Sequence, residues 1–266
     1  MTAVLCVSNT IVYPIVVSVL AVISAYEVLK TLALQRIYTI SVPVYAIAAV
    51  MPMLAYVLGD ILGREETLFI IILALVLFVL MMWMFFVAVF GRGIVSFTKI
   101  SAGFVLVMYI VACFSSLVII RHIDNIGLFC LGMVLVGAWI SDVFAYFTGV
   151  LFGKHKLIPE VSPKKTVEGS VGAIVCTTVL MMFYGFLVSL FTDLVPNYLV
   201  LAISGAILSV MGQIGDLIAS VVKREYGVKD YGTLLPGHGG IMDRFDSILA
   251  VSGAAMIISL LFAPFS

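Results

Sequence analysis

Eight stretches of the sequence are long and apolar enough to cross a membrane as helices, and this feature constrains the fold most. A membrane-spanning helix needs about 20 mostly apolar residues. Only 11% of the 266 residues are charged, whereas a soluble domain has about 25%. The sequence therefore predicts an all-α, polytopic transmembrane helix bundle of about eight helices, near residues 5–29, 38–58, 68–90, 101–120, 127–149, 170–192, 198–222 and 247–264.

Two polar loops, at about 150–169 and 223–246, interrupt the apolar sequence, and the other connections are short. They divide the chain into N-terminal transmembrane helices, at 1–120, and a region that carries both loops, at 121–266. An alternative for the first apolar run is a tight hairpin broken near Pro14, since proline disrupts a helix interior.

The basic residues indicate which side the polar loops face, because Lys and Arg favour cytoplasmic loops. If the 150–169 loop is cytoplasmic, twelve of the fourteen basic residues fall on that side, and only Arg64 and Arg121 do not. Both polar loops are therefore expected to face the cytoplasm, although some of their lysines can serve a site instead. The net charge is zero, so charge gives no support for nucleic-acid binding. The four cysteines have no metal-ligand or redox spacing.

Two aspartates lie inside predicted spans, where ionisable residues are costly and are functional candidates. Asp142 lies about eight residues, roughly 12 Å, from the cytoplasmic end of its helix, and Asp216 about seven residues from its own. We therefore expect both carboxylates at similar depth, either in a functional site or as structural partners of a neighbouring helix. Mostly small residues share each helical face, which predicts close packing against protein: Gly205, Ser209 and Gly212 beside Asp216, and Ala138, Ala145, Tyr146 and Gly149 beside Asp142. Glu27, at a helix end, is interpreted as an interfacial residue.

A second pair of acids, Asp243 and Asp246, stands at the start of the last apolar segment. If the last helix begins near Met242, the two share a face of its first turn. Four carboxylates would then converge near the cytoplasmic boundary, and a divalent cation is the natural counter-ion. Carboxylates with water suit Mg²⁺, which usually also takes substrate phosphate oxygens. His238 stands between glycines, where backbone amides and the ring can approach an anion.

Clusters of basic residues flank these acids in both polar loops. The first loop contains Lys154, Lys156, Lys164 and Lys165, and the second begins "SVVKREYGVKD". A patch for anionic lipid head groups is one interpretation. Beside acids that favour Mg²⁺, however, the lysines also suit phosphoryl chemistry. The residues thus predict a metal-dependent site for a phosphorylated substrate. A transporter is the alternative, but no inverted repeat is evident.

One stretch, "SVVKREYGVKDYGTLLPGHGGIMDRFD", resembles the signature of the phosphatidate cytidylyltransferase, or CDP-diacylglycerol synthase, family. Its fixed positions are Ser220, Lys223, Arg224, Lys229, Asp230, Pro236, His238, Gly239, Gly240, Asp243, Arg244 and Asp246. The resemblance extends upstream over "SDVFAYFTGVLFGKHKLIPEVSPKKTVEGSVG" and "GQIGDLIAS", so that it covers roughly 139–247. The family element that matches "SAYEVLK" arrives early here, which predicts a shortened or missing first helix. A ninth helix and the side of the N-terminus are therefore left open.

The resemblance implies an integral enzyme of a bacterial-type plasma membrane that joins CTP and phosphatidic acid into CDP-diacylglycerol and pyrophosphate. It implies Mg²⁺, with room for a second cation, and leaves a homodimer open. The residues expected to hold metal are Asp142, Asp216, Asp243 and Asp246. The catalytic candidates are Lys164, Lys165, Lys223, Arg224, His238 and Arg244. The substrate-binding candidates are Ser162, Glu168, Ser220, Lys229, Asp230, Gly239 and Gly240.

A related activity remains as an alternative, namely a CTP-dependent lipid kinase of the polyprenol or dolichol type. That reaction moves the γ-phosphoryl group and releases CDP, whereas the cytidylyltransferase releases pyrophosphate. A CDP-alcohol phosphatidyltransferase is disfavoured, because the Asp-Gly-x-x-Ala-Arg signature of those enzymes is absent from the sequence.

Overall fold

The expected helical membrane protein is confirmed by a computed structural model, which describes residues 8, 10–61, 66–91, 95–234 and 239–266. Within these residues, eight helical segments are long and apolar enough to span a membrane. Each lies close to a span predicted from the sequence. Helix α2 begins at Val12 and runs unbroken to Thr31, so the alternative of a hairpin broken at Pro14 is wrong. Pro14 lies in its first turn, where a proline is tolerated.

The described chain forms two compact units. The first consists of the described parts of Met1–His122 together with Tyr226–Arg244, and the second of Ile123–Glu225 together with Phe245–Ser266. The loop Tyr226–Arg244 falls by its contacts within the first unit, and the division of the chain into 1–120 and 121–266 stays a prediction. Each unit is described by itself below.

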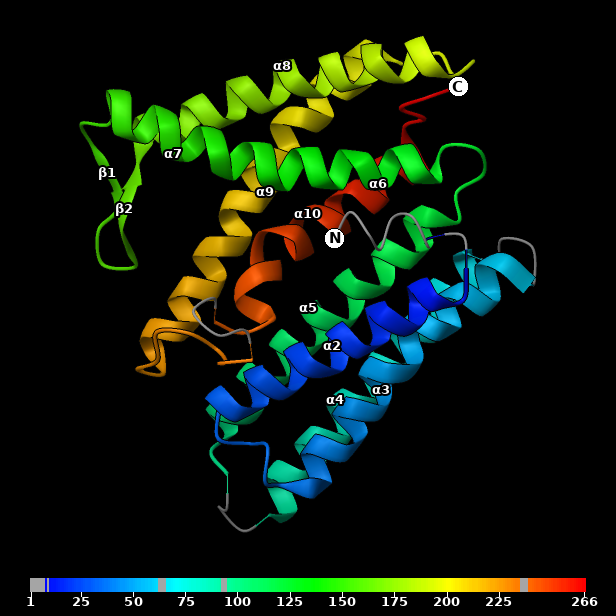
Figure 1. The fold of residues 1–266 in the computed structure, drawn as a ribbon. Helices are drawn as coiled ribbons and strands as arrows, with labels where there is room; N and C mark the ends of the chain where they lie inside the picture. Colours follow the sequence, from blue (N-terminus) through cyan, green and yellow to red (C-terminus); the bar gives the residue numbers. More distant parts are fainter. Residues whose placement is uncertain (1–7, 9, 62–65, 92–94, 235–238) are drawn as a thin grey trace. The chain divides into compact units, whose positions relative to one another are not determined.

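Four long helices build the first unit, and Figure 1 shows them as a bundle. They are α2 (Val12–Thr31), α3 (Tyr38–Tyr56), α4 (Glu66–Phe90) and α5 (Phe97–Arg121), with a π-helical turn η1 (Val57–Ile61) after α3. Helices α2, α3 and α5 pack against one another, and α4 packs on α3 and α5.

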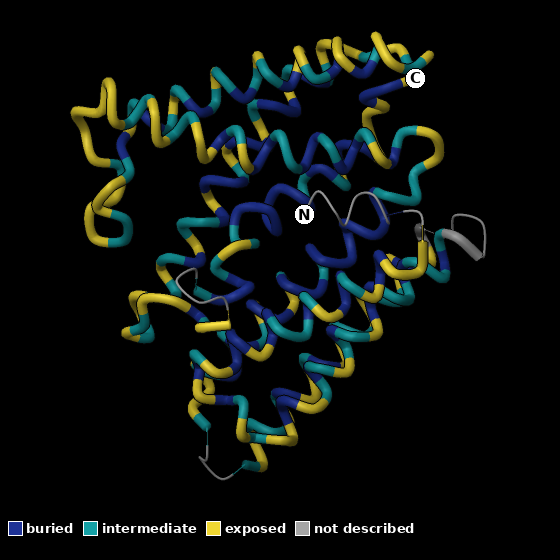
Figure 2. The backbone as a smooth tube through the Cα atoms, in the orientation of Figure 1, coloured by how far each residue is buried: buried dark blue, intermediate teal, exposed yellow. Residues whose placement is uncertain are grey.

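Polar groups tie these apolar helices together at two points. The Tyr13 hydroxyl of α2 donates to the carbonyl of Leu117 in α5 at 3.0 Å. The Trp83 indole N–H of α4 donates to the carbonyl of Thr39 in α3 at 2.7 Å. By contrast, many apolar side chains of α4 are exposed, and Figure 2 marks exposed residues along this helix in yellow. This exposure suits a helix that faces lipid, since a membrane imposes no penalty on exposed apolar surface.

The second unit begins with one interrupted helix, α6 (Gly127–Leu135), η2 (Val136–Ile140) and α7 (Ser141–Phe152). It continues with α8 (Val167–Phe191), α9 (Tyr198–Glu225) and all but the first turn of α10 (Met242–Leu261). Helix α8 packs against both α7 and α9. The π-helical turn η2 directly precedes Ser141 and Asp142, and such turns often occur at functional sites.

The small-residue face of α9 packs against protein as expected. Gly205 lies against the backbone of Thr178 in α8, and Gly212 lies against Val251 of α10. Ser209, between them, lies 2.8 Å from the Ser141 hydroxyl, oxygen to oxygen. This face brings the helix segments around Asp216 into close contact with their neighbours.

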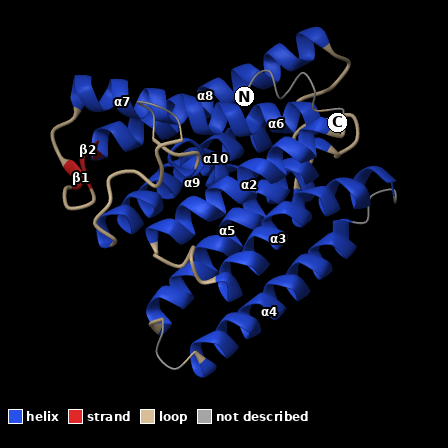
Figure 3. Ribbon diagram, turned by 60° about the horizontal axis from the view of Figure 1, so that its bottom comes forward, coloured by secondary structure: helices blue, strands red, loops and turns tan. Residues whose placement is uncertain are grey.

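A short β-hairpin occupies the first polar loop, which the sequence analysis left without secondary structure. Strands β1 (Lys156–Ile158) and β2 (Ser162–Thr166) pair antiparallel, with Lys156 opposite Thr166 and Ile158 opposite Ser162. Figure 3 shows the two strands in red beside the otherwise helical elements. The hairpin joins α7 to α8, and the Thr166 hydroxyl caps α8 by accepting from the Gly169 N–H at 3.1 Å.

Candidate active site

Three of the predicted metal ligands come together in the second unit, each from a different helix. Asp142 of α7 lies within electrostatic range of Asp216 of α9, and Asp246 of α10 lies within range of both. Asp142 is exposed, whereas Asp216 and Asp246 are half-buried. The expectation that the face of Asp142 packs against protein is therefore wrong at Asp142 and at Tyr146, which both line a cavity.

Two lysines compensate part of this negative charge. Lys165, from strand β2, forms an ion pair with the Oδ2 atom of Asp216, and both side chains are half-buried. Lys223, in the last turn of α9, interacts electrostatically with Asp246. A lysine of the hairpin and a lysine of α9 thus lie beside acids of α9 and α10.

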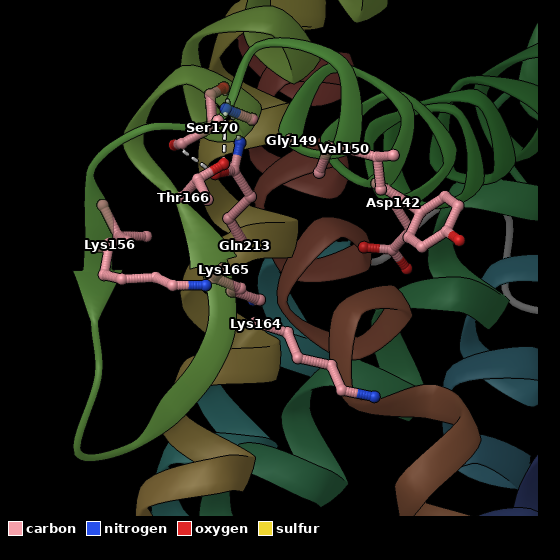
Figure 4. A pocket seen from close by; sticks show the side chains of 14 residues that line it. Asp142, Gly149, Val150, Lys156, Lys164, Lys165, Thr166, Ser170 and Gln213 are labelled. Atoms are coloured by element: carbon pink, nitrogen blue, oxygen red, sulfur yellow. Dashed lines mark hydrogen bonds between the residues drawn. The ribbon is translucent and has the colours of Figure 1, made fainter.

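A cavity of about 450 Å³ adjoins these charges, which is within the usual range for small-molecule sites. Figure 4 shows Asp142 on its α7 side and Lys156 on its hairpin side. The lining also includes Lys164 and Lys165. A cavity with one carboxylate and three lysines is suited to an anionic ligand that carries a cation.

A chain of hydrogen bonds begins at Ser170 and Gln213, which line this cavity, and it was not predicted from the sequence. Ser170 of α8 donates to the Gln213 side-chain carbonyl, and the Gln213 amide donates to the Ser209 hydroxyl at 3.3 Å. Ser209 in turn contacts Ser141, the residue before Asp142. Gln213 lies one turn before Asp216 on α9, so this chain links the helices that carry Asp142 and Asp216. The only sequence signal was the polar residue within "GQIGD".

Glu168, a predicted substrate-binding residue, holds the base of the hairpin in this structure. Its carboxylate accepts from the Lys154 N–H at 3.1 Å and from the His155 N–H at 3.2 Å. The His155 ring atom Nδ1 lies 2.6 Å from Oε1 of the same carboxylate. Glu168 therefore fixes where the lysine-bearing hairpin leaves α7, and its contact with substrate stays a prediction.

Asp243, the fourth predicted metal ligand, holds a loop within the first unit. Its Oδ2 atom accepts from the Tyr231 N–H at 2.8 Å and from the Gly240 N–H at 3.0 Å. Gly239 beside it has a φ of +80°, a conformation that suits glycine. The metal-binding role of Asp243 stays a prediction.

Glu27, an acid predicted to lie at the membrane interface, binds two backbone N–H groups, and its depth in the membrane stays a prediction. Its side chain is only 3% exposed. One carboxylate oxygen accepts from the Ile241 N–H at 3.0 Å, and the other from the Met242 N–H at 2.8 Å. The sequence showed only that an acid lies within an apolar helix. Its hydrogen-bond partners could not be predicted, because they lie more than 200 residues further along the chain.

The remaining candidates lie at the ends of the same elements. Arg224 and Ser220 belong to the last two turns of α9, and Ser162 begins β2. Lys229 and Asp230 are exposed in the connection that follows α9. Arg244 is exposed in the first turn of α10. His238 lies outside the described residues.

The carboxylates do not form a ready-made metal site. In the part of the chain that the structure describes, no three His, Cys, Asp or Glu side chains lie close enough together to hold an ion. The donor set nevertheless fits Mg²⁺, because this ion is usually bound through one or two carboxylates, water and substrate phosphates. Asp142, Asp216 and Asp246, which lie within electrostatic range of one another, are the carboxylates that would hold it.

The fold and the charged residues define a polytopic helical membrane protein with an acid and lysine cluster beside a cavity. The chain belongs to the cytidylyltransferase family, whose sequence model matches residues 1–262. It is 44% identical over 170 residues to the phosphatidate cytidylyltransferase of Bacillus subtilis. The aligned region covers 63% of this chain and 62% of that protein. It is 48% identical over 113 residues to the phosphatidate cytidylyltransferase of Staphylococcus haemolyticus, or 42% of each chain. The chain thus spans less than two-thirds of the length of these relatives.

Replacing Glu168 with glutamine should loosen the hairpin, because the neutral side chain loses one acceptor oxygen and its charge. We expect hydrogen exchange in residues 153–166 to become several times faster, as measured by mass spectrometry of the purified protein. Glu160→Gln is the matched control, since Glu160 is an exposed acid in the turn of the same hairpin. Equal exchange in the two variants would show that Glu168 does not hold the hairpin.

Proposed function

We propose that this protein is a phosphatidate cytidylyltransferase, which joins CTP and phosphatidic acid to give CDP-diacylglycerol and pyrophosphate. The observation that carries the proposal is the meeting of Asp142, Asp216 and Asp246 with Lys165 and Lys223 near one cavity. Such a set suits two phosphate-bearing substrates, because acids can hold a cation while lysines neutralise phosphate oxygens. Membership of the cytidylyltransferase family and the names of the relatives support the same reaction.

The bond changes require little acid or base chemistry from the protein. A phosphate oxygen of phosphatidic acid attacks the α-phosphorus of CTP. The bond between this phosphorus and the oxygen that bridges to the β-phosphate breaks, and pyrophosphate leaves with the electron pair. The lipid phosphate is largely ionised at neutral pH, so that no strong general base is needed. Catalysis then depends on holding two anions in line and neutralising them.

The residues of the second unit divide into two proposed roles. Lys164, Lys165, Lys223 and Arg224 neutralise and orient the phosphates of the two substrates. Asp216 and Asp246, assisted by Asp142, are the proposed holders of Mg²⁺. When bound, the ion supplies positive charge to the phosphate oxygens. The ion pair between Lys165 and Asp216 keeps both side chains in place beside the cavity.

The proposed site faces the cytoplasm. The bias of basic residues toward one set of loops supports this orientation. A site near this boundary would also suit both substrates, since the phosphate of a lipid lies at the membrane interface and CTP arrives from water. The lysine-bearing hairpin would then stand on the cytoplasmic side of α7 and α8.

Product analysis tests the proposed reaction directly. Purified protein is incubated with Mg²⁺, phosphatidic acid and CTP labelled at the α-phosphate. We expect the label to move into lipid as CDP-diacylglycerol, with an equal amount of pyrophosphate. Release of labelled CDP with a polyprenol or dolichol acceptor would instead indicate a lipid kinase. Absence of labelled lipid from an intact, folded preparation would contradict the proposal.

Asp246→Asn should lower turnover about a hundredfold or more, which is the usual effect of losing one electrostatic contact to a transition state. Asparagine preserves the shape of the side chain but removes its charge. Asp193→Asn is the control, since Asp193 is an exposed acid in the connection between α8 and α9. Both variants should elute from size exclusion in detergent like the wild type. Near-normal turnover of Asp246→Asn would remove Asp246 from the proposed site.

A further inference from the structure

Glu27 is a buried acid that the proposed chemistry does not use. It lies in α2, four residues before the end of the helix, and both of its oxygens accept from consecutive backbone N–H groups. These groups belong to Ile241 and to Met242, the first residue of α10. The first N–H groups of a helix lack partners within the helix. Glu27 therefore caps α10 from a helix far away in the sequence.

Two glycines let the loop approach this carboxylate closely. A Cβ atom added to Gly240 would lie 2.5 Å from each of the two Glu27 carboxylate oxygens. A Cβ atom added to Gly232 would also collide with the Glu27 carboxylate. Both contacts are too short for a real side chain, so that the loop backbone lies directly on Glu27.

A second acid holds the same loop from its other side. Asp243 accepts from the Tyr231 and Gly240 N–H groups, and it lies within electrostatic range of Glu27. Four backbone N–H groups, at residues 231, 240, 241 and 242, thus bind to two carboxylates. The repulsion between the two acids is offset by these donors and by the positive end of α10.

A neutral side chain cannot replace Glu27 in this arrangement. Glutamine has one acceptor oxygen, and its amide would place N–H donors against a backbone N–H. Burying a charge is also costly unless it is hydrogen-bonded. A buried carboxylate that accepts from two backbone N–H groups of one turn therefore fixes the backbone of residues 239–242 in a way that a neutral side chain would not.

We propose that Glu27 is a positioning residue for the substrate-binding turn of the family signature. It fixes the glycine turn and the start of α10, so that the signature residues Gly239, Gly240, Asp243 and Arg244 are held in the geometry that substrate binding needs. This role rests on the proposed cytidylyltransferase function. It acts through the loop backbone, and Glu27 itself touches no reacting atom.

The test compares Glu27→Gln with Tyr13→Phe, which removes a buried hydrogen bond from the same helix at a distance from the loop. We expect Glu27→Gln to lower kcat about tenfold to a hundredfold, since small misplacements of reacting groups have effects of that size. Tyr13→Phe should lose a similar amount of thermal stability and keep its kcat. The midpoint of thermal unfolding is measured for both in the same detergent. Equal kcat values for the two variants would overturn the proposal.

Hydrogen exchange tests the role of Glu27 with a measurement that does not depend on catalysis. In Glu27→Gln, peptides that cover residues 239–245 should exchange faster than in wild type, whereas Tyr13→Phe should leave them unchanged. If the wild-type protein makes no CDP-diacylglycerol, the proposed function fails. The hydrogen-exchange measurement still tests whether Glu27 holds the turn. Unchanged exchange in Glu27→Gln would overturn the role of Glu27 whatever the reaction is.

Discussion

Charge inside an apolar helix bundle must be compensated, and the arrangement of the second unit depends on how this is done. Three carboxylates from three helices lie within electrostatic range of one another, and Lys165 pairs with Asp216. Removing one partner of a buried pair is more costly than the net contribution of the pair, because it leaves a charge uncompensated. The hairpin meets this requirement at Asp216, because it carries Lys165. The cavity lies beside this group of charges and is lined by Asp142 and by the lysines of the hairpin.

A second group of acids is compensated by backbone N–H groups instead. Glu27 and Asp243 bind the loop before α10, and Glu168 binds the base of the hairpin. These acids set the paths of the two segments that carry most of the family signature. Among the described residues, these acids thus differ in their partners: Asp216 pairs with a lysine, whereas Glu27, Asp243 and Glu168 accept from backbone N–H groups of loops. A carboxylate of either kind looks the same in a sequence.

The membrane helices could be predicted because length and apolar composition determine them locally. Residue counts along two helices also predicted that Asp142 and Asp216 lie near each other, and the two carboxylates are within electrostatic range. The hairpin could not be predicted, because its strands are short, charged and without a period-two apolar pattern. The role of Glu27 was missed because its donors are backbone groups more than 200 residues away. Asp142 was expected to pack against protein because its neighbours on the helix face are small. Small neighbours predict a close approach of other elements, but such a face can equally form the wall of a cavity.

The central proposal is that Asp142, Asp216 and Asp246 hold a divalent cation beside the lysines when substrate is bound. It is tested most directly by titrating Mn²⁺, in place of Mg²⁺, into the purified protein with a non-hydrolysable CTP analogue and measuring free Mn²⁺ by electron paramagnetic resonance. Saturable binding is expected for the wild type and for Asp193→Asn, and a large loss of affinity for Asp216→Asn and Asp246→Asn. Equal Mn²⁺ affinity in all four proteins would contradict the account.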